Sequence, residues 1–208
     1  MLWLITVIAL WGIIHSILAS VGFKDFLRRM LGDGFMKFYR LLYNVFAVVS
    51  LLPVLYLMIS LPDKTLYQVP PPWSYLMIAG QAISALLLFI AVSQTDVLAF
   101  VGLRQLSEGQ EKSSLVTNGL YRIVRHPLYT FSLLILWLTP SVTVNTFVVY
   151  LALTIYLLIG ALFEERKLLR EFGQEYASYK SVTPMLIPGL SKPAVQRRAP
   201  AGKSGGNK

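Results

Sequence analysis

Five polar side chains in the second half of the sequence are of types that bind a charged, partly flat ligand. They are Arg125, His126, Tyr129, Glu164 and Glu165. A carboxylate accepts hydrogen bonds from sugar hydroxyls or from an ammonium group, and an arginine holds a carboxylate in a bidentate fork. Tyrosine and histidine rings offer flat faces to a heterocycle. These residue types suit a ligand with a zwitterionic part and a flat part, provided that the chain brings them together.

An apolar block separates the polar residues up to Tyr129 from Glu164 and Glu165, and it explains how these two groups can meet. Residues 128–163 include no charged side chain in 36 positions. A bilayer core of about 30 Å needs about 20 apolar residues per helix, so this block is too long for one span and short for two. Residues 139–141, Thr-Pro-Ser, are a turn signal within it. We therefore predict a helical hairpin with arms at residues 128–138 and 142–163.

The two ends of an antiparallel hairpin lie side by side. We therefore expect the polar residues before the first arm to face Glu164 and Glu165 after the second. This arrangement predicts a polar pocket of mixed charge at the membrane surface, open to a soluble ligand. From the residues alone an alternative stays open, in which Arg125 anchors a helix end, Tyr129 is an interfacial aromatic and Glu164 pairs with Lys167 on a solvated helix.

The composition places the whole chain in a membrane. Of its 208 residues, 55% are hydrophobic and 14% are charged, against about 25% charged in soluble domains. The mean hydropathy is +0.60, which excludes a disordered chain and disfavours a water-soluble globule. The sequence has no cysteine, which rules out a disulfide framework, a thiolate zinc site and a cysteine nucleophile. We expect no metal site, and no residue stands out as a dedicated catalytic base.

Three further apolar stretches precede the hairpin, at residues 2–20, 38–61 and 73–100. Each is long enough to cross a bilayer, and Pro53 inside the second is a kink that membrane helices tolerate. With the two hairpin arms they make about five membrane helices. The sequence therefore predicts an all-α integral membrane protein, with residues 1–188 as one membrane domain. Residues 189–208 are predicted to be a disordered basic tail.

Basic residues cluster in alternate connections. Residues 21–40 hold five, residues 104–125 hold four and the chain after residue 163 holds nine, whereas residues 61–73 hold one and the hairpin turn none. The positive-inside rule then puts the N-terminus outside and the C-terminus, with the polar pocket, on the cytoplasmic side. This topology accounts for most of the net charge of +9, so we expect no nucleic-acid partner.

Asp96, the only carboxylate within the apolar stretches, and His15 lie inside such stretches. An ionisable group in a membrane segment suggests a function by default. We nevertheless favour structural roles for both. Asp96 lies near the cytoplasmic end of its stretch, where it can pair with Arg104 or cap the next turn, and His15 can hydrogen-bond a neighbouring helix.

The segments around the hairpin resemble those of the isoprenylcysteine carboxyl methyltransferase superfamily of membrane methyltransferases. Its signature is an R-H-P-x-Y-x-G segment, an apolar stretch and a glutamate pair, which stand here at residues 125–131 and 164–165. An L-V-T-x-G-x-Y-R pattern precedes it at residues 115–122, and an L-x-x-x-F-G-x-x-Y-x-x-Y pattern follows at residues 168–179. One position departs from the signature, because Phe131 replaces its glycine.

This resemblance implies that residues 115–188 hold a cytoplasmic binding site for S-adenosylmethionine. It assigns cofactor binding to Arg125, His126, Tyr129, Glu164 and Glu165, with Tyr121 and Arg122 as weaker candidates. In this interpretation the carboxylates meet the ribose hydroxyls or the amino group, and the rings flank the adenine. The cofactor supplies the electrophile, so the protein mainly binds and orients.

Two shorter strings, His15-Ser16 and residues 96–105, resemble the bacterial branch that includes methanethiol S-methyltransferase and the NnrU-like membrane proteins. The resemblance thus ranks thiol S-methylation first, ahead of isoprenylcysteine-type carboxyl O-methylation and phospholipid N-methylation. It implies a small or lipid-like acceptor and a bacterial inner membrane. The rival hypothesis is a membrane sensor, or an assembly or transport protein, on the same scaffold, and Phe131 is its best support. The oligomeric state stays open.

Overall fold

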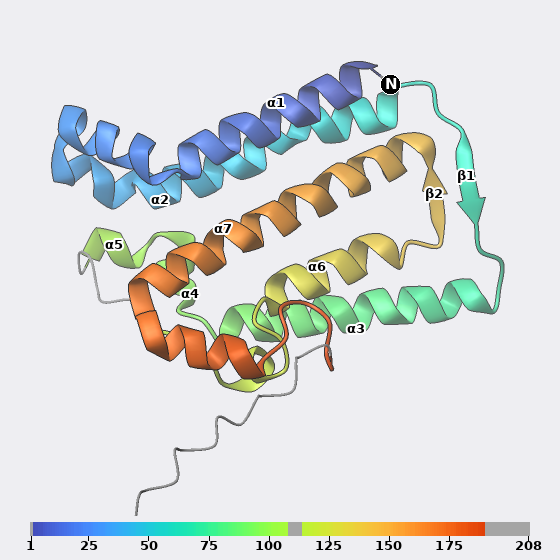
Figure 1. Cartoon of the computed structure of the whole chain (residues 1–208). Coiled ribbons are helices and arrows are strands. Elements are labelled where there is room, and N and C mark those ends of the chain that lie inside the picture. The colour runs from blue at the N-terminus through green and yellow to red at the C-terminus, as the bar shows by residue number, and fades with distance from the viewer. Residues whose placement is uncertain (1, 108–113, 190–208) are drawn as a thin grey trace, which may run out of the picture.

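The computed structural model describes residues 2–107 and 114–189, and most of these residues are helical (Figure 1). The elements in chain order are α1 (Leu2–Ala19), α2 (Val21–Ser60), β1 (Thr65–Gln68), α3 (Trp73–Ser93), α4 (Val97–Val101), α5 (Arg104–Ser107), η1 (Gly119–Arg122), α6 (Pro127–Trp137), β2 (Ser141–Thr143) and α7 (Val144–Val182). Within the described ranges, α1, α2, α3 and α7 are long and apolar enough to cross a membrane, and α6 is a shorter apolar helix. The predicted all-α integral membrane protein with five apolar helices is confirmed.

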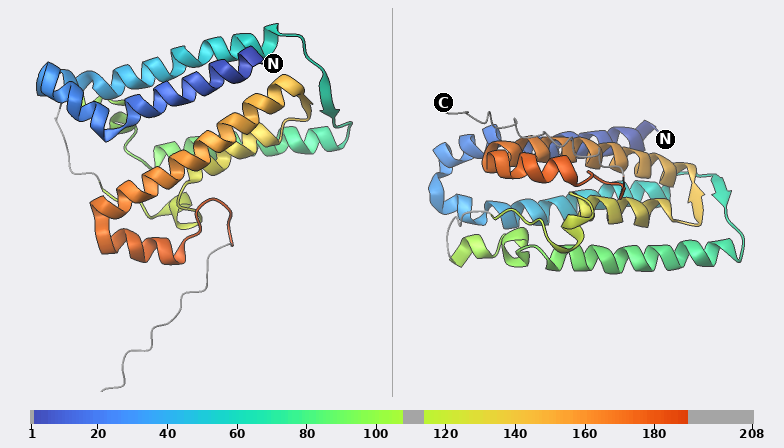
Figure 2. Two further views of the ribbon diagram at one scale, coloured as in Figure 1. Left: turned by 45° about the horizontal axis from the view of Figure 1, so that its top comes forward. Right: turned by 60° about the horizontal axis from the view of Figure 1, so that its bottom comes forward.

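Helix α7 lies between two helix pairs. α1 packs along α2 and α3 packs along α6, while α7 contacts members of both pairs (Figures 1 and 2). The buried apolar centre is small, and its residues Leu4, Ile8, Val54 and Val149 join α1, α2 and α7. Many large apolar side chains on the long helices point outward instead, among them Phe89 at 70% exposure. Such an outward-facing apolar surface suits helices that are surrounded by lipid.

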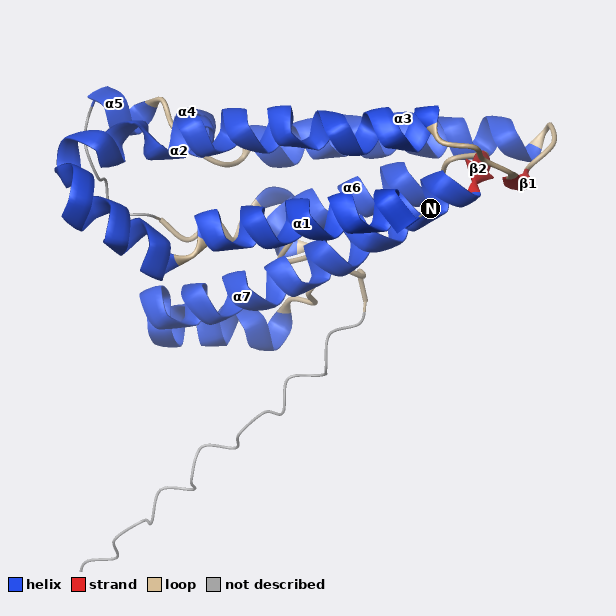
Figure 3. Cartoon of the chain, turned by 90° about the horizontal axis from the view of Figure 1, so that it is seen from above, coloured by secondary structure: helices blue, strands red, loops and turns tan. Residues whose placement is uncertain are grey.

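A short antiparallel strand pair closes one end of the bundle (Figure 3). β1 follows α2 and β2 lies in the turn between α6 and α7, so the pair ties the α2–α3 connection to the predicted hairpin turn. Asp63 strengthens this tie, because its Oδ1 accepts hydrogen bonds from the backbone N–H groups of Lys64 at 2.8 Å and Asn145 at 3.1 Å. The hairpin turn was predicted, but no alternating pattern announced strands this short.

The second and third helices differ from the prediction at one end each. α2 begins at Val21 rather than near residue 38, because Ser20 caps it, but the helix is broken at Gly32, whose φ of 76° and ψ of 172° are non-helical. α3 ends at Ser93 rather than near residue 100, because Asp96 starts a new helix by accepting a hydrogen bond from the backbone N–H of Ala99 at 2.9 Å. Asp96 also pairs with Arg104, so it takes both structural roles that the sequence suggested.

The elements that carry most of the basic residues lie at the end of the bundle opposite the strands. The α1–α2 junction, α5, η1 and the last part of α7 all lie there (Figure 1). This distribution agrees with the alternation of charge in the sequence, and the orientation of the bundle in a membrane stays a prediction. The predicted disordered tail falls almost wholly on residues 190–208, outside the described residues, and the domain boundary stays a prediction too.

Gly102 ends α4 in a left-handed conformation, at φ 99°. A Cβ at this position would lie 2.6 Å from the backbone nitrogen of Leu41. We expect Gly102→Ala to lower the free energy of unfolding by about 1–2 kcal/mol from the backbone conformation alone, with the clash against α2 adding to the loss. Gly160→Ala is the matched control, because a Cβ there meets nothing within 4 Å. Thermal unfolding in detergent should show a lower melting temperature for the first variant only, and equal values would contradict this account of the turn.

Candidate functional site

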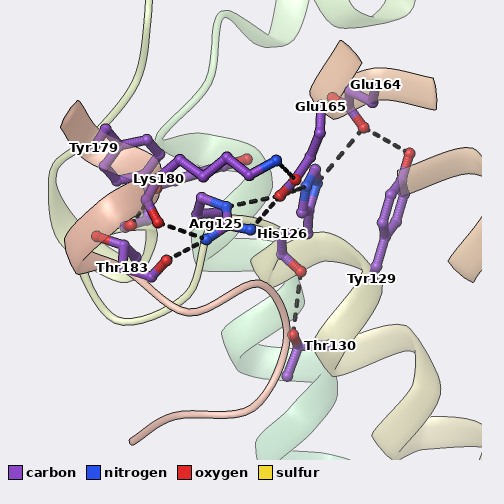
Figure 4. A network of polar contacts seen from close by, with 10 residues as sticks. Arg125, His126, Tyr129, Thr130, Glu164, Glu165, Tyr179, Lys180 and Thr183 are labelled. Atoms are coloured by element: carbon purple, nitrogen blue, oxygen red, sulfur yellow. Dashed lines mark hydrogen bonds and ion pairs between the residues drawn. The ribbon is translucent and has the colours of Figure 1, made fainter. Parts of the chain in front are cut away.

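An ion pair between Arg125 and Glu165 forms the centre of the polar cluster (Figure 4). Nε of Arg125 donates to Oε1 of Glu165 at 2.7 Å, and Nη2 donates to the same oxygen. The other carboxylate oxygen, Oε2, lies 2.6 Å from Nζ of Lys180. The side chains of Arg125 and Glu165 are 8% and 6% exposed. A carboxylate buried this deeply is costly unless it is paired and hydrogen-bonded, and here two cations satisfy it.

The C-terminal segment holds this junction from the other side with main-chain carbonyls. The carbonyl oxygens that accept hydrogen bonds belong to Lys180, Thr183, Pro184, Met185 and Leu186. Nη1 of Arg125 donates to the first two. The backbone N–H groups of Arg125 and His126 donate to the next two at 2.9 and 3.1 Å, and Oγ1 of Thr130 donates to the last at 2.8 Å. The segment is therefore fixed against the first turn of α6.

The segment reaches this place because α7 changes direction at Gly173. Its φ of 52° and ψ of −122° are non-helical and belong to a backbone region that glycine adopts most easily. The last part of α7 then turns back under the bundle toward η1 (Figure 1). There Tyr176 is buried and the hydroxyl of Tyr179 donates to the carbonyl of Tyr121. The F-G and Y-x-x-Y parts of the sequence pattern thus have a local structural use.

One edge of the cluster is formed by His126, Tyr129 and Glu164 and opens to solvent at Glu164, whereas the His126 side chain is 5% exposed. The hydroxyl of Tyr129 donates to Oε2 of Glu164 at 2.8 Å, and the Tyr129 ring stacks on His126 with centroids 5.4 Å apart and planes 4° apart. The Glu164 side chain is 45% exposed. Nε2 of His126 is buried and lacks a hydrogen-bond partner among the described residues, although it lies 3.5 Å from Oε1 of Glu165. The exposed carboxylate of Glu164 therefore lies 3.7 Å from Nδ1 of His126, while the buried Nε2 faces Glu165.

The protonation states at this edge follow from burial. Burial lowers the pKa of His126 below its ordinary value of 6.5, against the opposing effect of Glu164 and Glu165. At neutral pH the imidazole is therefore uncharged and offers one N–H and one lone pair. Burial also raises the pKa of Tyr121 to about 12, and the negative charge of Glu164 acts in the same direction. Tyr121 therefore keeps its proton and remains a hydrogen-bond donor.

The turn before this cluster is built on Gly119 and Gln94. Gly119 has a φ of 57° and begins η1, and Oε1 of Gln94 accepts a hydrogen bond from the backbone N–H of Leu120 at 2.9 Å. A Cβ on Gly119 would lie 2.4 Å from the Gln94 amide. The end of α3 thus fixes η1 and with it Tyr121. Arg122 is exposed on η1 and makes no ion pair or hydrogen bond with the rest of the described chain.

The structure brings together the residues that the hairpin argument predicted to meet. Arg125 pairs with Glu165, and Tyr129 contacts Glu164. Glu164 also lies near His126 and does not pair with Lys167. Phe131, the departure from the family signature, is half-buried on α6 outside this network.

Sequence reasoning missed Lys180, the carbonyls around Thr183, and Gln94. Gly173 was a usable signal for the first two, because a glycine within a helical pattern can mark a change of direction. A polar residue at the end of an apolar stretch was the only signal for Gln94, and it did not specify a partner.

Comparisons with known proteins show the family to which the chain belongs. A family described as phospholipid methyltransferase matches residues 75–175, a range that includes most of α3, all of α6 and the glutamate pair. The chain is 33% identical over 187 residues to methanethiol S-methyltransferase 2 of Bradyrhizobium diazoefficiens, an alignment that covers 88% of this chain and 71% of the relative. It is 30% identical over 187 residues to methanethiol S-methyltransferase of a Pseudomonas species, which covers 87% of this chain and 70% of the relative.

A more distant relative is methanethiol S-methyltransferase of Mycobacterium tuberculosis, which is 26% identical over 196 residues, covering 88% of this chain and 76% of the relative. No solved structure matches the chain. The relatives align along most of its length, and the described part has the apolar helices of a membrane protein. The chain therefore belongs to the family of integral-membrane methyltransferases that includes the methanethiol S-methyltransferases.

Proposed function

We propose that this protein transfers a methyl group from S-adenosylmethionine to a small thiol, and that the methyl donor binds at the accessible edge of the polar cluster. The observation that carries the proposal is the half-exposed carboxylate of Glu164, 3.7 Å from Nδ1 of His126, whose buried Nε2 makes no hydrogen bond with the described residues. The names of the relatives support a thiol as the acceptor. The basic end of the bundle, which holds the cluster, is then the cytoplasmic end in a bacterial inner membrane.

The residues at the edge fit the chemical groups of this donor. Glu164 can accept hydrogen bonds from the ribose hydroxyls or the amino group, and neutral His126 can complete its hydrogen bonding with the same ligand. The parallel rings of His126 and Tyr129 offer a flat surface to the adenine. Tyr121 adds a donor beside them. Arg122 stays a weaker candidate, because its side chain makes no contact with the network.

Arg125 and Glu165 take part in a different way. Their shared charge is already satisfied within the protein, by each other, by Lys180 and by two carbonyls. We therefore assign Arg125 and Glu165 to holding the C-terminal segment and His126 in place. Glu165 can also contact the donor directly through a remaining lone pair. When bound, the donor supplies an electrophilic methyl group on a sulfonium. The protein's task is then to bind and orient the two reactants and to exclude water.

A second candidate function is the methylation of a phospholipid headgroup. The specific observation in its favour is the match of residues 75–175 to a family described as phospholipid methyltransferase. Both functions use the same donor site and differ in the acceptor. They can be separated by supplying purified protein with labelled S-adenosylmethionine and either an alkyl thiol or phosphatidylethanolamine vesicles, and then locating the label.

The donor site can be tested directly with Glu164→Gln. Glutamine still accepts a hydrogen bond from Tyr129 but lacks the negative charge, so the variant should fold as the wild type does. A hydrogen bond to a charged group contributes about 1.5–3 kcal/mol, which corresponds to a loss of affinity of about 10- to 100-fold. Isothermal titration of the detergent-solubilised protein with S-adenosylmethionine and S-adenosylhomocysteine measures this loss.

The matched control is Glu175→Gln, which makes the same charge change at an exposed position on the last part of α7. It should leave both affinities within about twofold of wild type. Unchanged affinity in Glu164→Gln would contradict the assignment of the edge. If folded wild-type protein binds neither ligand in the presence of trial thiols, the result favours a non-enzymatic membrane protein over a methyltransferase.

The lowered pKa of His126 predicts a dependence of stability on pH. Below about pH 6.5 the unfolded chain takes up a proton on this histidine that the folded chain does not accept, so stability falls as the pH drops through this range. The groups that set this balance are Arg125 beside it, Tyr129 on α6, and Glu164 and Glu165 on α7.

His126→Gln removes this titration but keeps a polar side chain of similar size. The drop in melting temperature between about pH 7.5 and pH 5.5 should therefore be smaller in the variant than in the wild type. Above about pH 7 the two proteins should show the same dependence on pH. An equal drop at acid pH in both proteins would show that His126 is not held neutral by the fold.

A further inference from the structure

A second buried histidine lacks a hydrogen-bond partner, and it lies in the membrane part of the chain. His15 on α1 is 8% exposed, and its Nδ1 is buried without a partner among the described residues. Three aromatic rings surround the imidazole: Trp11 at 4.9 Å between centroids, Tyr43 at 4.7 Å and Tyr156 at 5.8 Å. We call these four residues the aromatic cluster. It joins α1, α2 and α7.

The polar groups of the three surrounding aromatic residues are satisfied, in contrast to Nδ1 of His15. Nε1 of Trp11 donates to Oγ of Ser50 at 3.1 Å. The hydroxyl of Tyr156 interacts with those of Tyr43 and Ser16. A histidine that only joined membrane helices would be expected to use its ring nitrogens on a neighbour. A buried nitrogen without a partner points instead to a group that the structure does not contain.

The aromatic cluster borders the proposed donor site through Tyr129. The hydroxyl of Tyr129 donates to Glu164 and also interacts electrostatically with Tyr156 and Tyr43. Tyr156 precedes Glu164 by eight residues on α7, which is about 12 Å along the helix axis. Tyr129 therefore contacts the polar edge directly and is coupled electrostatically to the aromatic cluster.

The surroundings of His15 suit a small, uncharged, apolar molecule with one acidic hydrogen. The walls are aromatic rings, to which a sulfur atom binds favourably, and lipid-facing residues such as Ile13 and Ile14 surround the position on α1. A small alkyl thiol has these properties and partitions into lipid. We propose, resting on the proposed function, that the thiol acceptor binds in the aromatic cluster and that Nδ1 of His15 accepts its proton.

The thiolate, not the thiol, is the nucleophile in such a transfer. The S–H bond breaks and its proton moves to the lone pair on Nδ1 of His15, which leaves the electron pair on the acceptor sulfur. That sulfur forms a bond to the methyl carbon, and the bond from this carbon to the donor's sulfonium breaks with its electron pair going to the donor sulfur. The products are a thioether and a neutral donor remnant, and the imidazolium then releases its proton to solvent.

His15→Gln separates this role from a packing role, because glutamine is polar but cannot take up the proton. General-base assistance contributes about 10²- to 10⁴-fold, so we expect the turnover of ethanethiol at neutral pH to fall by at least about 100-fold. Thiophenol is largely ionised at neutral pH and does not need a base, so its turnover should fall by less than about tenfold. Raising the pH should partly restore ethanethiol turnover in the variant.

The affinity for S-adenosylhomocysteine and the melting temperature of His15→Gln are measured beside these rates. An equal fall for both thiols would assign His15 to packing and overturn the proposal, as would unchanged turnover of ethanethiol. A wild-type protein that binds no donor would instead overturn the proposed function. Ser84→Ala on α3 controls for loss of a buried polar group in a membrane helix and should leave both thiol rates unchanged.

A readout that needs no turnover uses Trp11, which stacks on His15. Titration of the donor-free protein with ethanethiol should quench tryptophan fluorescence. Trp11→Phe should abolish most of this response. Trp137→Phe should keep it, because Trp137 lies outside the aromatic cluster and donates a hydrogen bond to Thr154. A response that survives in Trp11→Phe would place the thiol elsewhere and overturn the assignment, whatever the rates show.

Discussion

The buried pair of Arg125 and Glu165 is the interaction on which the polar end of this protein depends. It joins the start of α6 to α7 across 40 positions of sequence, and Lys180 and the C-terminal carbonyls attach to the same two side chains. Removing one partner of such a pair costs about 3–5 kcal/mol, because the other charge is left buried and uncompensated. The pair also sets the positions of its neighbours in sequence. Once it has formed, His126 and Glu164 lie on the accessible side.

Burial thus divides the polar residues into a closed part and an open part. Arg125, Glu165 and Lys180 satisfy one another and fix the fold locally. His126, Tyr129 and Glu164 remain able to bind a ligand. The aromatic cluster is coupled to them electrostatically through Tyr129. Under the proposed function, a water-soluble reactant and a lipid-soluble one would meet near this tyrosine. Such an arrangement suits a transfer reaction between two phases.

The contacts predicted from the sequence are those that follow from chain geometry. A hairpin must bring its ends together, so the meeting of Arg125, His126 and Tyr129 with Glu164 and Glu165 followed from an uncharged block and one turn signal, whereas the individual pairings did not. The cap and ion pair of Asp96 followed from its place at the end of an apolar stretch. Such inferences need only helix length, burial and charge.

The contacts that were not predicted depend on a change of direction or on the main chain. The reversal at Gly173 depends on one residue's backbone angles, and a helical pattern runs across it without interruption. The pairing of β1 with β2 involves too few residues to show a period. The orphan nitrogens of His15 and His126 depend on the exact placement of neighbouring groups, which no spacing along a sequence contains.

The main-chain hydrogen bonds of the C-terminal segment have a consequence for which substitutions this region can accept. Five backbone carbonyls provide its hydrogen bonds to the start of α6, and every amino acid carries such a carbonyl. Substitutions at the positions after Lys180 therefore leave the acceptors in place as long as the path of the chain is kept. These hydrogen bonds therefore constrain the path of the segment and place no demand of their own on which side chains it carries.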